Sequence, residues 1–75
     1  MMDLEQLFHS FLNIKINSHN RDIDVLKLNA MSEEVIYLLV YLRDNIGLNL
    51  NDFYGDFPIT FNLINRYINE TCNNN

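Results

Sequence analysis

The stretch SEEVIYLLVYLRDNIG, residues 32–47, has the clearest helical pattern in the sequence. Ser32 precedes its apolar residues and is predicted to be the N-cap, followed by Glu33 and Glu34 in the first turn, where the helix dipole stabilises carboxylates. Gly47 stands where a left-handed C-terminal cap is expected. The apolar residues recur at helical spacing. The face they form contains Val35, Leu38, Leu39, Leu42 and Ile46, and Ile36 and Val40 widen it. This pattern predicts a helix from about Ser32 to Ile46.

Two further helices are predicted on either side of this one. Asp3 can cap a first helix over residues 4–13, whose apolar residues form one continuous stripe. Thr60 can cap a last helix that ends near Ile68, and the asparagine-rich tail from Asn69 to residue 75 is expected to fray. The first stripe contains Leu4, Leu7, Phe8, Phe11 and Leu12, and the last contains Phe61, Ile64 and Ile68. The thirteen asparagines show no repeat and are interpreted as compositional bias.

Two connections of different character join the predicted helices. Residues 14–31 contain six isoleucine, valine and leucine side chains, too many for a loop left in water, so this segment is predicted to lie across the helices. These side chains belong to Ile14, Ile16, Ile23, Val25, Leu26 and Leu28. Residues 48–60 contain Gly55 and Pro58 and are predicted to form a loop with at most one short helical turn.

Length and composition indicate a single all-α domain. Seventy-five residues leave no room for a second domain, and two glycines and one proline are too few for a many-turned β fold. The core is expected to span residues 4–68. A net charge of −5 argues against nucleic-acid binding. A single cysteine, Cys72, favours a reducing, cytoplasmic setting, and neither a signal-peptide pattern nor an apolar run long enough to span a membrane is found. The protein is expected to be a monomer.

The order and spacing of these landmarks resemble the acyl carrier protein family, including its peptidyl and polyketide carrier relatives. Typical carriers have a leucine shortly before Asp-Ser-Leu, a helix that ends near Phe-Gly-Ile, and a final helix entered through Thr-Val and finishing near Tyr-Ile. The matching positions here are Leu28, Ser32, Ile46, Gly47, Leu48, Thr60, Phe61, Tyr67 and Ile68. The sequence LNIK, residues 12–15, matches the family's Leu-Gly-Val-Lys. The resemblance covers roughly residues 4–68 and implies a small bundle of three main helices plus a short helical turn, with a long first loop.

The resemblance implies that a phosphopantetheinyl transferase attaches 4′-phosphopantetheine to Ser32. The arm would then carry acyl or aminoacyl groups as thioesters to the enzymes of a specialised bacterial biosynthetic pathway, while the domain itself catalyses nothing. The attachment motif departs from the family, because Met31 and Glu33 stand where carriers have aspartate and leucine. Losing such an apolar contact costs on the order of 1–3 kcal/mol of recognition.

The family's partner surface is the acidic flank of the second helix. Glu33, Glu34 and Asp44 retain part of it, and Tyr37 and Tyr41 lie one turn apart beside it. The two tyrosines are interpreted mainly as half-buried flanks of the core, and the alternative is an exposed aromatic pair that binds a partner.

Three simpler interpretations remain open. Ser32 can be a plain N-cap. The chain can be a carrier-related protein that lacks the arm and acts as an interaction adaptor in a natural-product or peptide-maturation system. His9 and His19 have no catalytic or metal-binding pattern around them and are predicted to be ordinary surface histidines.

Overall fold

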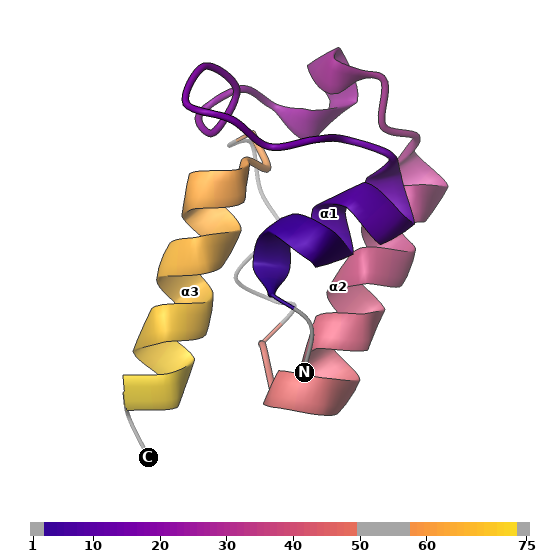
Figure 1. Ribbon diagram of the computed structural model, residues 1–75. Helices are drawn as coiled ribbons and strands as arrows, with labels where there is room; N and C mark the ends of the chain where they lie inside the picture. Colours follow the sequence, from indigo (N-terminus) through magenta and orange to yellow (C-terminus); the bar gives the residue numbers. More distant parts are fainter. Residues whose placement is uncertain (1–2, 50–57, 74–75) are drawn as a thin grey trace.

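The computed structural model describes residues 3–49 and 58–73, which contain helices and no strand. The elements are α1 (Leu4–Leu12), a 3₁₀ helix η1 (Val25–Leu28), α2 (Ser32–Ile46) and α3 (Phe61–Asn73). Figure 1 shows α1 crossing α2, with α3 standing beside them. The prediction of an all-α fold with three main helices is confirmed. The short helical turn predicted within residues 48–60 falls mainly on residues 50–57, which lie outside the described residues.

Left-handed residues end three of the helical elements. Asn13 follows α1 with φ 55°, Asn29 follows η1 with φ 70°, and Gly47 follows α2 with φ 82°. Gly47 was predicted in this role, whereas the asparagines were interpreted only as compositional bias. Asparagine enters the left-handed region more readily than other non-glycine residues. Two asparagines therefore have a definite structural role, because they terminate helices.

The core lies between the inner faces of α1, α2 and the first turns of α3. Phe8, Leu38, Leu42 and Ile64 are among its most deeply buried side chains. Phe8 packs edge-to-face against Phe61, with ring centroids 5.2 Å apart and planes inclined by 73°. Fourteen hydrophobic residues are buried in the part of the chain that the structure describes. They are Leu7, Phe8, Leu12, Ile14, Ile16, Val25, Ala30, Val35, Leu38, Leu39, Leu42, Leu48, Phe61 and Ile64.

The segment from residue 14 to residue 31, called the strap below, lies across the helices as predicted. It runs from the end of α1 to the start of α3 and back to the start of α2 (Figure 1). Ile14, Ile16 and Val25 are buried beneath it, but Ile23 and Leu26 are exposed to 38% and 51%. The strap also contains η1, which the sequence did not predict. The strap therefore completes the core with only some of its apolar side chains.

The last helix is longer than its sequence indicates. Thr60 caps it as predicted, because the Thr60 hydroxyl accepts a hydrogen bond from Leu63 N at 3.1 Å. The helix then continues through Asn73, whereas the sequence placed its end near Ile68, with fraying from Asn69. The low helix propensity of asparagine is a weak influence of a few tenths of a kcal/mol per residue, which neighbouring helical turns can outweigh.

Candidate functional site

The start of α2 differs by one residue from the prediction. Met31 has extended backbone angles, φ −88° and ψ 147°, and its carbonyl accepts the first helical hydrogen bond from Val35 N at 3.1 Å. Met31 is therefore the N-cap, and Ser32 is the first residue inside the helix. The Glu34 carboxylate accepts a hydrogen bond from Met31 N at 2.9 Å. The carboxylate therefore pairs the N–H of the N-cap residue itself. Because Met31 occupies the N-cap position, the prediction of Ser32 as N-cap is wrong.

The Ser32 hydroxyl is exposed and uncommitted. Among the residues that the structure describes, none exchanges a side-chain hydrogen bond with it. It lies at the N-terminal end of a fifteen-residue helix, where the backbone N–H groups and the helix dipole favour a negatively charged group. The position therefore offers an accessible hydroxyl at the positive end of the helix dipole, while the carboxylates of Glu33 and Glu34 in the same turn oppose that potential.

Several exposed side chains near the start of α2 are apolar, whereas the resemblance to carrier proteins implies an acidic surface there. Met31 is 63% exposed, and Ile36 and Tyr37 are 57% and 63% exposed on the next turn. Ile36 was predicted to widen the inner face of α2, but it faces solvent. Glu33 is also exposed on the same outer side of the helix, because residues three and four apart share a helix face. Glu33, Ile36 and Tyr37 therefore share one exposed face of α2, whereas Met31 is exposed separately at the N-cap.

The predicted partner residues do not all belong to this surface. Glu33, Tyr37 and Asp44 are exposed, whereas Glu34 is half-buried and bonded to the Met31 backbone. The two tyrosines of α2 have separate environments. Tyr41 is half-buried against α1, with its ring centroid 5.3 Å from that of Phe11, so the interpretation as a core flank holds for Tyr41 and fails for the exposed Tyr37.

Asp44 is paired at the far end of α2. Its carboxylate accepts a hydrogen bond from Arg43 Nε at 3.2 Å, and both side chains are more than half exposed. Exposed pairs of this kind contribute little to stability. They do reduce the local charge, so the acidic character of α2 is strongest at its N-terminal end, near Ser32.

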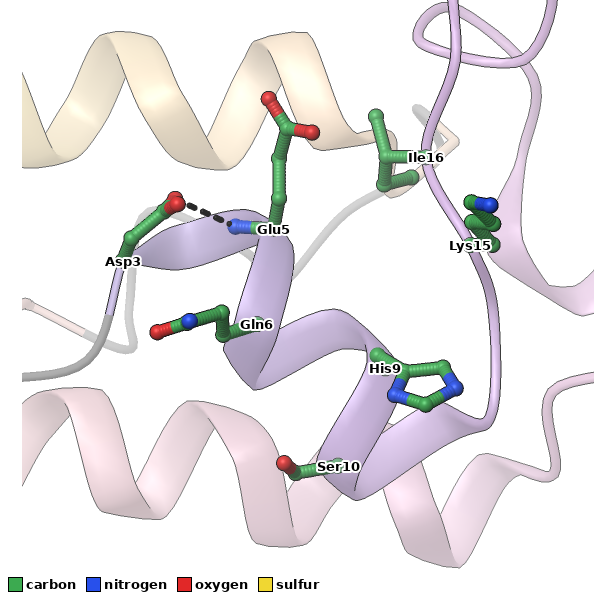
Figure 2. A pocket seen from close by; sticks show the side chains of 7 residues that line it. All are labelled: Asp3, Glu5, Gln6, His9, Ser10, Lys15 and Ile16. Atoms are coloured by element: carbon green, nitrogen blue, oxygen red, sulfur yellow. Dashed lines mark hydrogen bonds between the residues drawn. The ribbon is translucent and has the colours of Figure 1, made fainter.

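A groove lies between α1 and the strap and has a volume of about 410 Å³ (Figure 2). Its carboxylates are already engaged, since Asp3 caps α1 through Glu5 N and Glu5 pairs with Arg21. The groove is lined by Asp3, Glu5, Gln6, His9, Ser10, Lys15 and Ile16. His9 and His19 are exposed, as predicted. Within the described ranges, no group of three or more His, Cys, Asp or Glu side chains is placed to hold a metal ion.

No helix within residues 3–49 and 58–73 has the length and apolar character needed to cross a membrane. Neither a family model, nor a curated protein, nor a solved structure matches the chain significantly. The resemblance to carrier proteins therefore depends on the landmarks of the sequence itself.

Replacing the Ser32 hydroxyl is expected to leave stability almost unchanged. Because that hydroxyl caps nothing, Ser32→Ala is expected to lower the free energy of unfolding by less than about 0.5 kcal/mol. Thr60→Ala removes a real cap and is expected to cost about 1–2 kcal/mol. Urea denaturation of both variants and the unmodified protein measures the difference. Similar losses in the two variants would mean that Ser32 does cap α2.

Proposed function

We propose that this chain is an acyl-carrier-type domain that bears a 4′-phosphopantetheine arm on Ser32. The arm carries acyl or aminoacyl groups as thioesters between the enzymes of a specialised bacterial biosynthetic pathway in the cytoplasm. The domain acts as a monomer, binds its enzymes in turn and performs no catalysis itself. One observation carries this proposal: the Ser32 hydroxyl is exposed at the start of α2 and has no capping role.

This observation matters because capping was the competing explanation of the serine. A serine at an N-cap is accounted for by helix stability alone. With Met31 at the cap and Glu34 holding its N–H, that account no longer applies to Ser32. An exposed hydroxyl at a positive helix end suits attachment of a phosphodiester.

Attachment requires a transferase and coenzyme A. The bond between the serine oxygen and phosphorus forms, the pyrophosphate bond of coenzyme A breaks, the nucleotide part leaves, and a base on the transferase takes the hydroxyl proton. The residues of this chain supply only the nucleophilic oxygen and the docking surface. Met31 and Glu33 replace the usual aspartate and leucine, so we expect a transferase that tolerates an apolar residue before the serine and an acidic one after it.

The proposal is tested by incubating the purified protein with coenzyme A and a broad-specificity phosphopantetheinyl transferase, then measuring the intact mass. We expect one phosphopantetheine-sized gain in the unmodified protein and in Ser18→Ala, an exposed serine of the strap. Ser32→Ala should show no gain. A gain retained by Ser32→Ala would place the modification elsewhere. No gain with several transferases, including any encoded near this chain's gene, would contradict the carrier function.

The alternative function is that of an adaptor without the arm, and the exposed apolar side chains at the start of α2 favour it. Ile36 and Tyr37 are exposed next to each other on one face of α2, and aromatic residues are frequent in the centres of protein interfaces. Ser32→Ala separates the two functions in the native pathway. It would abolish the activity of a carrier and leave an adaptor unaffected.

A further inference from the structure

Three hydrogen bonds join the strap to the start of α3. Val25 N donates to the Ile59 carbonyl at 2.9 Å, and Asn62 N donates to the Arg21 carbonyl at 3.0 Å. The Asn62 side-chain amide donates to the Asp22 carboxylate at 2.7 Å. The Asn62 N–H is one of the first backbone N–H groups of α3 and has no acceptor within the helix, so its bond to the strap satisfies it. The strap therefore fixes the beginning of α3 directly.

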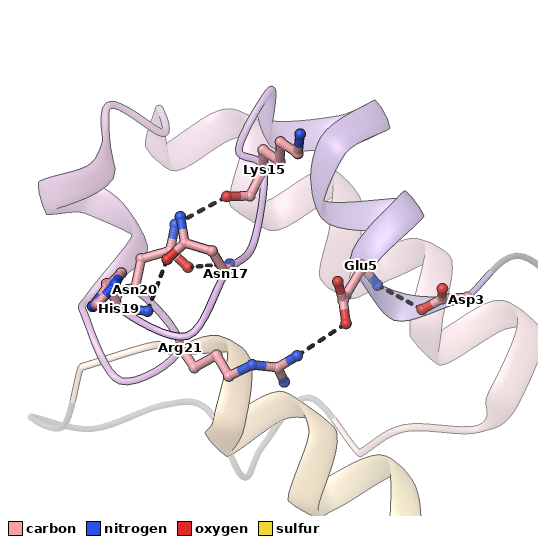
Figure 3. Close-up of polar contacts among 7 residues, drawn as sticks. All are labelled: Asp3, Glu5, Lys15, Asn17, His19, Asn20 and Arg21. Carbon is pink, nitrogen blue, oxygen red and sulfur yellow. Dashed lines mark hydrogen bonds and ion pairs between the residues drawn. The ribbon is translucent and has the colours of Figure 1, made fainter.

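The Arg21 side chain extends this connection to α1. Its guanidinium pairs with the Glu5 carboxylate at 3.0 Å, as Figure 3 shows, and lies 4.8 Å from the centre of the Phe61 ring. One side chain therefore contacts both the first helix and the last. Arg21, Asp22 and Asn62 are called the latch below.

Burial decreases along α3. Phe61 and Ile64, in its first two turns, are buried in the core. From residue 65 to residue 71, every side chain is half-buried or exposed. Because the free energy of docking follows the apolar area removed from water, most of it comes from the beginning of the helix. In the described residues only Phe61 and Ile64 of α3 are buried, fewer than in α1 or α2, and an element with few buried apolar contacts can open separately from the rest of a domain.

We propose that α3 is a lid on the α1–α2 core and that the latch controls how often it opens. In the open state α3 detaches as a unit, while α1 and α2 remain folded against each other. Opening separates Phe61 from Phe8 and so exposes the apolar interior around Phe8. This device concerns the fold and does not depend on the function proposed for Ser32.

Hydrogen exchange under native conditions, followed by NMR at low urea concentrations, tests the lid. In the unmodified protein, the amides of residues 64–71 should exchange through one common opening, which is more frequent than the opening of the middle of α1 and α2. Asn62→Ala removes the bond to Asp22 and should speed exchange in α3 about fivefold to tenfold, the change expected from losing one hydrogen bond. Exchange in α1 and α2 should stay the same. Arg21→Ala should act in the same direction.

Asn45→Ala is the matched control, because Asn45 also donates a side-chain bond, to the Tyr41 carbonyl within α2 at 2.8 Å. It should leave exchange in α3 unchanged. Two results would overturn the proposal. One is that all three helices of the unmodified protein exchange through the same opening. The other is that the latch variants leave α3 unaffected or speed all helices equally, which would make α3 part of one cooperative unit.

Discussion

Phe8→Ala is expected to lower the free energy of unfolding by about 3–5 kcal/mol. Phe8 is fully buried, and its ring makes the edge-to-face contact with Phe61 that joins α1 to α3. The truncation removes that contact and leaves a cavity where three helices meet. A chain of 75 residues has a total stability of roughly 4–11 kcal/mol, so the variant should lose a large part of it.

Phe11→Ala is the control for this prediction. Phe11 lies on the same helix but is half-buried, with its ring against Tyr41 at 5.3 Å. Its truncation should cost about half as much or less, since part of the side chain already contacts water. Urea denaturation followed by far-ultraviolet circular dichroism compares the two. Equal losses in the free energy of unfolding would show that the complete burial of Phe8 does not make it more important for stability than the half-buried Phe11.

The helices could be predicted because their local signals agree. In α2, helical spacing, acidic residues in the first turn and Gly47 at the end all indicate the same segment. The position of the cap could not be predicted in the same way. Ser32 is a favoured capping residue and Met31 is not, but the Glu34 carboxylate bonds to Met31 N. The sequence is compatible with either Ser32 or Met31 as the N-cap, and in the structure the N-cap is Met31.

The side of α2 that faces solvent was harder to predict than the helix itself. Apolar residues cover more than half of its circumference, so periodicity alone allows several orientations. Packing against α1 and the strap selects Leu38 and Leu42 as buried and leaves Ile36 and Tyr37 outside. As a result, the sequence identified Ser32 as the candidate site but did not predict that Ile36 and Tyr37 on the same helix are exposed.

The latch has no signal in the sequence. Asp22 and Asn62 are forty residues apart, and neither belongs to a motif that indicates the other. Arg21 and Glu5 likewise meet only because the strap returns over the start of α3. Single-sequence reasoning finds local patterns, whereas such contacts depend on the path of the whole chain. This is why the strap was predicted to cover the helices but not to hold α3.

Ile64→Ala should have the second largest effect on stability, about 2–5 kcal/mol. Ile64 is fully buried and is the last deeply buried residue of α3 within the described part of the chain. Its truncation removes apolar area from the turns that dock this helix. Helical circular dichroism and urea denaturation measure the loss.

Ile68→Ala makes the same chemical change one turn later, where the side chain is only half-buried. We expect it to cost about 1–2 kcal/mol, less than the change at Ile64, because less apolar area leaves water on folding. The ratio of the two losses measures how unevenly α3 is held along its length. If Ile68→Ala costs as much as Ile64→Ala, the later turns of α3 contribute equally to docking. The decrease in burial along α3 would then not be matched by a decrease in stabilising free energy. Opening of α3 would cost more than it does for a helix held mainly by its first turns.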